Sequence, residues 1–205
     1  MVFAPTPRAL GVAIGVSLGL GVLIGWAAFH GGSSKPVALN PQQVQTVPLP
    51  LNAQHVPQVR VALVPIVNRV LGVRLGRPPG WRASVQHQVI KLLSPDQTMS
   101  LGVSAPSPPN QAKQLRRLDK AQLLKLFKPA RVIGRTRGKI GPVAVLTSEI
   151  EGTNQRHQRI RILTTAASSA FRTYSIEAFS APTPPALRLA ELEAILRSFR
   201  FFRPR

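Results

Sequence analysis

The sequence predicts an α+β protein in which an antiparallel β-sheet is flanked by helices and preceded by one N-terminal transmembrane helix. Three observations support this fold class. Short runs of alternating polar and apolar residues, separated by glycine and proline turns, recur from residue 72 onward. Two longer segments of the same region carry apolar residues at helical spacing. A continuous apolar run lies near the N-terminus.

The apolar run covers residues 9–29 and contains no charged residue. At ~1.5 Å per residue a helix of this length spans roughly 31 Å, which is enough to cross a bilayer core. We predict a transmembrane helix, with residues 1–8 in the cytoplasm because Arg8 is the only charged side chain before the span. A cleaved signal peptide is the alternative, since Gly25-Trp26-Ala27 offers small residues at the positions that signal peptidase requires.

Glycines recur every four residues in this run, at Gly11, Gly15 and Gly19. Such spacing lets a second membrane helix approach closely, so it predicts a helix-packing face. The alternative is the ordinary abundance of glycine in membrane helices.

Residues 30–58 are rich in proline and glutamine and have no apolar periodicity, which predicts an extended linker. The remaining residues, 59–205, form the predicted basic α+β head domain. Its first strands are expected at residues 72–75, 85–92 and 99–103. A helix is expected at 111–127, capped by Asn110, with an apolar face of Leu115, Leu118, Ala121 and Leu124.

The second half of the head predicts four antiparallel strands joined by short turns, at 130–137, 143–150, 158–165 and 171–179. A closing helix follows, with Thr183 as its cap and Pro184-Pro185 in its first turn. Its buried stripe is expected to consist of Leu189, Leu192, Ile195, Leu196 and Phe199.

Several of these segments resemble the PsbP-like family, which includes the extrinsic luminal protein of photosystem II and its cyanobacterial and chloroplast paralogues. The matching stretches are Gly72-Val73-Arg74-Leu75, Pro78-Pro79-Gly80-Trp81, Tyr174-Ser175-Ile176-Glu177-Ala178 and Ile195-Leu196-Arg197-Ser198-Phe199-Arg200-Phe201. The resemblance covers about residues 70–203 and implies a sandwich with a central antiparallel sheet. These motifs are structural rather than catalytic. Trp81, which follows Pro-Gly, is expected to fill one end of the core.

No catalytic, cofactor-binding or metal-binding residue is predicted. The chain has no Cys, which excludes disulfides, thiolate metal sites and Cys nucleophiles. Phosphate-binding loops, zinc-protease motifs and nucleophile elbows are absent. His87 or His157 could combine with Glu149 or Glu151 in a metal site, but a solvent-facing strand position explains both histidines. An enzyme without a recognisable motif remains an alternative function.

Charge is the strongest functional signal, because the net charge is +20. Ten basic residues and one acidic residue, Asp119, lie between positions 113 and 139. The basic residues are Lys113, Arg116, Arg117, Lys120, Lys125, Lys128, Arg131, Arg135, Arg137 and Lys139. The first four share one helical stripe. We expect these ten to bind a partner.

These observations predict a non-enzymatic membrane accessory or assembly protein whose head lies outside the cytoplasm, in the thylakoid lumen or periplasm. An acidic membrane complex fits the anchor, the glycines and the charge together, and the family resemblance suggests a photosystem. Anionic lipid headgroups are an alternative partner that fits the charge alone. Nucleic acid is disfavoured, because the head has few aromatic residues for base stacking.

Overall fold

The computed structural model describes residues 61–86 and 88–205. The predicted transmembrane helix, its glycines Gly11, Gly15 and Gly19, the linker 30–58 and His87 therefore lie outside the described residues. Neither helix in the described ranges is long and apolar enough to cross a membrane.

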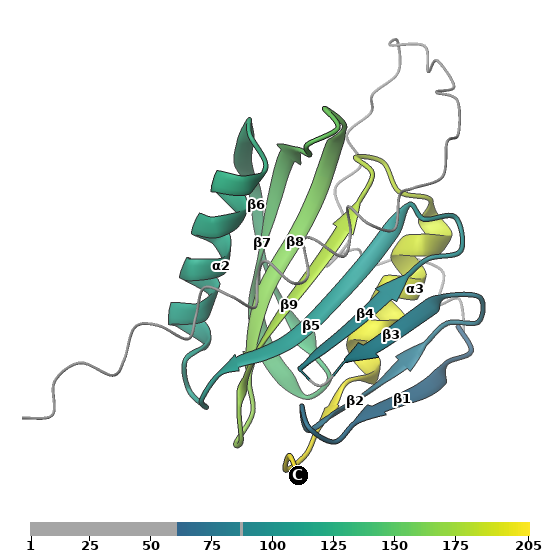
Figure 1. Ribbon diagram of the computed structural model, residues 1–205, viewed down its shortest axis with the longest axis vertical. Helices are drawn as coiled ribbons and strands as arrows, with labels where there is room; N and C mark the ends of the chain where they lie inside the picture. Colours follow the sequence, from purple (N-terminus) through teal and green to yellow (C-terminus); the bar gives the residue numbers. More distant parts are fainter. Residues whose placement is uncertain (1–60, 87) are drawn as a thin grey trace, which may run out of the picture.

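Two antiparallel sheets and two helices make up the head, which confirms the α+β class (Figure 1). The larger sheet has the strand order β3-β4-β5-β9-β8-β7-β6, and the smaller has the order β1-β2-β10. The elements are β1 (Val64–Asn68), β2 (Val73–Arg77), β3 (Arg82–Gln86), β4 (Val89–Leu93), β5 (Met99–Ser107), α2 (Ala112–Leu126), β6 (Ala130–Ile140), β7 (Val143–Thr153), β8 (Arg159–Ser168), β9 (Thr173–Ser180), α3 (Ala186–Ser198) and β10 (Arg200–Phe201).

The two helices pack on opposite faces of the seven-stranded sheet. On one face, Leu123 and Phe127 of α2 join an apolar cluster with Phe179 and Ile162 of the sheet. On the other face, α3 and strand β2 enclose the larger core, to which Trp81 contributes. Figure 1 shows this division, with α2 and α3 at opposite sides of the sheet. The sheet is therefore covered on both faces, although not along its whole width.

Burial of each strand follows its place in the sheet. All eight residues of β9, which lies between β5 and β8, are buried. In β6, at the sheet edge, exposed and half-buried residues alternate from Ala130 to Lys139. The register shifts between Val132 and Gly134, so the exposed residues lie on one face of β6 before the shift and on the other face after it, whereas the central strand β9 is covered on both faces.

Several boundaries differ from the sequence-based expectations. The expected strand 85–92 is two strands, because the chain turns between Gln86 and Val89, which pair with each other. Asn110 is not a cap: α2 has Gln111 at that position and no side-chain cap hydrogen bond, and Asn110 adopts a φ of 65°. Likewise, α3 begins after Pro185 rather than at a Thr183 cap, since the Pro185 carbonyl accepts from Arg188 N–H.

The β6–β7 turn depends on a glycine that no larger residue could replace. Gly141 has a φ of 54°, and a Cβ there would lie 2.1 Å from the carbonyl oxygen of Phe199. Its N–H donates to the carbonyl of Leu196 at 2.9 Å. This contact fastens the end of the β6–β7 hairpin to the C-terminal part of α3.

Candidate functional site

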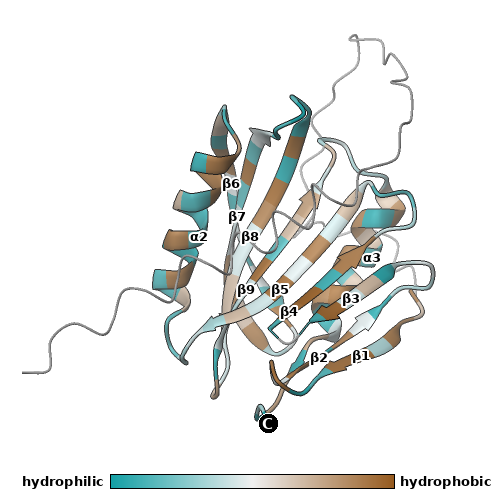
Figure 2. Ribbon diagram, in the orientation of Figure 1, coloured by the Kyte–Doolittle hydropathy of each residue, from teal (hydrophilic) through white to brown (hydrophobic). Residues whose placement is uncertain are grey.

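Helix α2 lies on the sheet through a different face from the one expected. Leu118 is 54% exposed and Ala121 is exposed, so both expected core positions are wrong. Leu115 is buried as expected, and the inward side continues from it through Asp119 and Leu123, spaced four residues apart. Leucines occur around most of this helix, so its apolar pattern did not single out one face; Figure 2 shows apolar and hydrophilic residues interleaved along α2.

The inward carboxyl group of Asp119 forms a polar contact with the sheet. Ser175 Oγ donates to Asp119 Oδ2 at 2.7 Å. Burial raises the pKa of Asp119 to about 6, although the Ser175 hydrogen bond opposes this shift. Asp119 therefore loses its proton near neutrality rather than at the usual acidic pH.

A second carboxyl group, Glu177, lies two residues along β9 from Ser175. It is 7% exposed, and its Oε2 has no hydrogen-bond partner in the structure. Burial raises its pKa to about 8, and the charge of Asp119 adds to the shift. Thr164, its register partner on β8, is also buried with an unpartnered Oγ1. We call Asp119 and Glu177 the buried carboxyl pair.

The buried carboxyl pair was not predicted from the sequence. The available signal was a glutamate placed between Ile176 and Ala178 in a predicted strand, since a charged residue among apolar neighbours is unusual in a core strand. Nothing in the spacing of Asp119 and Glu177 predicts that the helix brings them to the same face of the sheet, because that depends on how α2 docks.

The ten predicted partner-binding residues fall on α2, on β6 and in the connection between them. Eight are exposed, and Arg116 and Lys120 are half-buried. Arg131 binds Glu151, with 3.0 Å between Arg131 Nη2 and Glu151 Oε2. The other nine form no ion pair within the described part of the chain.

The α2 and β6 groups lie on the same side of the sheet. Directly opposite residues on neighbouring strands point to the same face of a sheet. Arg135 lies opposite Ser148, Ser148 opposite Thr164, and Thr164 opposite Glu177, which faces α2. Arg137 and Lys139 follow Arg135 at alternate positions and so face the same way. We define the basic surface as Lys113, Arg116, Arg117 and Lys120 of α2 with Arg135, Arg137 and Lys139 of β6.

The α2 residues of the basic surface lie on the flank of the helix that is turned toward β6. Leu124 is one turn beyond Lys120 and two turns beyond Arg116. It packs against the same apolar cluster as Ala130 and Val132 of β6. The two halves of the basic surface therefore lie on the same face of the sheet, one on α2 and one on the edge strand β6.

No carboxylate side chain forms an ion pair with the basic surface. The chain has seven Asp and Glu residues. Five are in ion pairs with arginines outside the basic surface: Asp96, Glu149, Glu151, Glu191 and Glu193. The other two are the buried carboxyl pair. No carboxylate side chain of the chain is therefore in an ion pair with a residue of the basic surface, and Asp119 is the one acidic residue on the same helix.

The candidate metal ligands are engaged elsewhere. Glu149 pairs with Arg161, and Glu151 with Arg131 and Arg159; hydrogen bonds from those two arginines lower the pKa of Glu151. His157 is exposed in the β7–β8 turn. Across residues 61–86 and 88–205, no group of three His, Asp or Glu side chains could hold a metal ion.

Trp81 lies in the core and is 1% exposed, which confirms the expected position. Its Nε1–H donates to Glu191 Oε2 at 2.9 Å. Arg188 also donates to Glu191 and, through Nε, to Asp96 Oδ2 at 2.8 Å. This network joins α3 to the turn before β5 and satisfies the buried polar atom of the indole.

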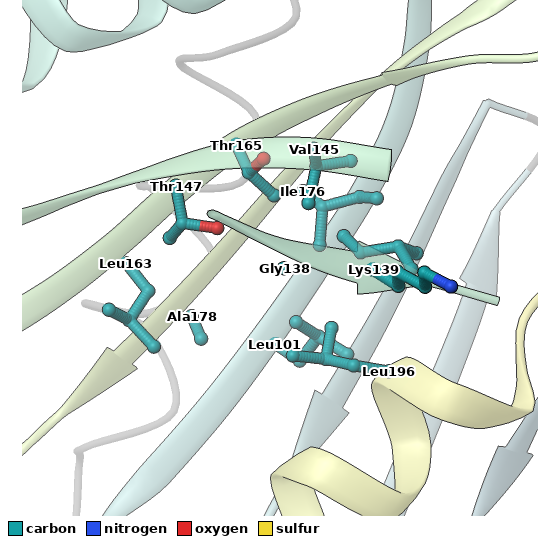
Figure 3. Close-up of a pocket in the computed structure, with 11 residues that line it drawn as sticks. Leu101, Gly138, Lys139, Val145, Thr147, Leu163, Thr165, Ile176, Ala178 and Leu196 are labelled. Carbon is teal, nitrogen blue, oxygen red and sulfur yellow. The ribbon is translucent and has the colours of Figure 1, made fainter. Parts of the chain in front are cut away.

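A small apolar cavity lies on the α3 side of the seven-stranded sheet. Figure 3 shows Leu101, Ile176 and Ala178 lining it, together with Leu196 of α3. Its volume is about 20 Å³. Because one water needs roughly 10–15 Å³ on this measure, the cavity is too small for an organic substrate.

No family model and no curated protein sequence matches the chain. Solved structures do match. One is a Bacteroides thetaiotaomicron protein (TM-score 0.49, 11% identity). The alignment covers 67% of this chain and 47% of the Bacteroides protein. Another is cyanobacterial PsbP from Synechocystis (TM-score 0.48, 10% identity, covering 69% of this chain and 94% of that one).

A third match is the immunity protein TplEi of Pseudomonas aeruginosa (TM-score 0.39, 13% identity, covering 66% of this chain and 47% of that one). This chain thus spans about half the length of the Bacteroides and Pseudomonas proteins. All three TM-scores are below 0.5, so the matches establish neither family nor function.

Proposed function

We propose that the protein is a non-enzymatic, membrane-anchored accessory or assembly factor whose head docks on an acidic partner through the basic surface. One observation carries this proposal: every carboxylate side chain of the chain is either paired with an arginine outside the basic surface or lies between α2 and the sheet. The seven basic side chains therefore repel one another with no ion-paired carboxylate among them. An acidic partner would relieve that repulsion and be steered toward the surface.

The partner that we propose is an acidic protein complex of the same membrane. Residues 9–29 would hold the head at the membrane from its extracytoplasmic side, in the thylakoid lumen or periplasm. The PsbP-like motifs of the sequence suggest a photosynthetic complex. Anionic lipid is the second candidate, because basic residues near a charged membrane each contribute about 1 kcal/mol.

The test compares two variants of the full-length protein that lose equal charge. The surface variant replaces Lys113, Arg117, Arg135 and Arg137 with Gln. The control variant replaces Arg69, Arg74, Arg82 and Arg203 with Gln; these four are also exposed, and none of them forms an ion pair among the described residues. Each protein is assayed against immobilised polyglutamate, anionic vesicles and duplex DNA over a salt titration.

We expect the surface variant to bind polyglutamate more weakly than the control at low salt, with a shallower salt dependence, because screening acts on fewer contacts. Equal binding by both variants would mean that the basic surface is only a solvated face. Preferential loss of vesicle or DNA binding would favour those partners instead. Pull-down from solubilised membranes with the same variants then tests the natural complex.

A further inference from the structure

Strand β6 is an unusually long open edge. It is the last strand of the seven-stranded sheet, and among residues 61–86 and 88–205 it pairs with β7 alone. Its eleven residues compare with five in β3, the strand at the opposite edge. Figure 1 shows β6 as the outermost strand, beside α2. An edge strand presents backbone N–H and C=O groups that can pair with another chain.

Its two faces carry different side chains. Arg135, Arg137 and Lys139 alternate on the α2 face and are exposed. The opposite face has Gly138, where an added Cβ would meet nothing within 4 Å. A neighbouring strand would therefore meet a row of three exposed basic side chains on one face, while the opposite face carries half-buried Thr136, Gly138 and the buried Ile140.

We propose that an extended acidic segment of the partner adds to this sheet as an eighth strand beside β6. The inference rests on the proposed function and specifies the form of the partner. Backbone hydrogen bonds to β6 would provide affinity, and acidic side chains at alternate positions would face Arg135, Arg137 and Lys139. Oppositely charged cross-strand pairs stabilise such an arrangement.

The same three residues disfavour a second copy of this chain as the occupant. Pairing one β6 with another would bring two rows of basic side chains together, and like charges across a strand pair are destabilising. Gly134, on the other face, has the carboxylate of Glu149 within 3.3 Å of an ideal Cβ, but that carboxylate already binds Arg161. Charge complementarity therefore selects an acidic strand.

The test uses three synthetic peptides of alternating Glu and Thr with the full-length protein. The first is unmodified. The second is N-methylated at alternate central residues, which leaves the N–H groups of one strand edge free. The third is N-methylated at every central residue, which removes the donors of both edges while keeping the charge. Strand addition requires one free edge.

We expect the first two peptides to bind similarly and the third to bind at least about tenfold more weakly, since several backbone hydrogen bonds are lost together. Amides of β6 should gain protection from hydrogen exchange with the first peptide and not with the third. The Arg135, Arg137 and Lys139 to Gln variant should weaken all binding, whereas a control that replaces the exposed Arg69, Arg74 and Arg82 with Gln, and so loses the same three charges, should not.

Equal binding by all three peptides would overturn strand addition and leave charge-driven docking intact. Protection of α2 amides without protection of β6 would also overturn it. Failure of both the peptides and polyglutamate to bind would instead reject the proposed function on which the inference depends.

Discussion

The stability of the head should fall as the pH rises from about 5 to 8, and replacing Glu177 with Gln should remove most of this dependence. Between about pH 4.5 and pH 8 the native state keeps the proton of Glu177, because burial raises the pKa of this group, whereas the unfolded state has released it. The native state therefore binds more protons than the unfolded state. Its free energy of unfolding must fall as the pH rises through this range and be largest under acidic conditions.

The expected size follows from proton linkage. One proton difference changes the free energy of unfolding by about 1.4 kcal/mol per pH unit. Between pH 5 and pH 8, Glu177 should thus contribute a loss of roughly 3 to 4 kcal/mol. Asp119, with a pKa of about 6, adds to the loss mainly below pH 6. The Gln variant should match the parent near pH 5 and exceed its stability near pH 8.

The measurement is urea unfolding of the full-length protein in detergent, followed by circular dichroism at several pH values. Glu193→Gln is the matched control, since it removes one carboxylate from a partly exposed ion pair on α3. That control should keep the pH dependence of the parent. A parent whose stability rises from pH 5 to pH 8, or a Glu177→Gln variant that keeps the parent's slope, would refute the placement of this carboxyl group.

Three further predictions test the membrane segment, the docking of α2 and the β6–β7 turn. The full-length chain should stay with membranes through a carbonate wash, because burial of about 20 apolar residues outweighs screened charge contacts; release of intact chain would exclude the span. Leu123→Ala should destabilise the head by about 2 to 5 kcal/mol in chemical unfolding, whereas Leu118→Ala should cost less than about 1 kcal/mol; the reverse order would mean that α2 docks through the expected face. Gly141→Ala should lower the melting temperature because its Cβ collides with the Phe199 carbonyl, while Gly138→Ala, which has open space, should change it little; similar effects of both would contradict the close contact at the turn.

Sequence patterns predicted elements whose side chains alternate or repeat with one face toward the core. Strands β6 to β8 and helix α3 are of this kind, and the buried positions Leu192, Ile195 and Phe199 agree with the expected stripe; β9 was also predicted, although both of its faces are buried. Strand β1 was not predicted, and β10 has only two residues, too few for a periodic signal. Strands β3 and β4 were merged because their turn between Gln86 and Val89 contains no glycine or proline.

The sequence predicted which basic residues form the candidate site, but it did not predict how those residues are placed relative to one another. Both basic groups are visible in the sequence, one as a helical stripe and one as an alternation on a strand. Their proximity depends on which flank of α2 faces β6, and Leu124 settles this by packing against the cluster shared with Val132. The face of α2 was mispredicted for the same reason: Leu118 and Leu123 are equally apolar, and the choice between them is made by the sheet beneath.

The small sheet has a consequence for the order in which the chain folds. Strand β2 lies between β1 and β10, so that Arg74 faces Arg200 and Val73 faces Phe201. Phe202 N–H then donates to the Gly72 carbonyl at 2.9 Å. The ribosome synthesises the chain from the N-terminus, so the β1–β2 hairpin emerges early. Its third strand, β10, becomes available only when the end of the chain has been synthesised. Pairings between such distant segments form slowly, which leaves one edge of β2 available to chaperones or misassembly throughout that interval.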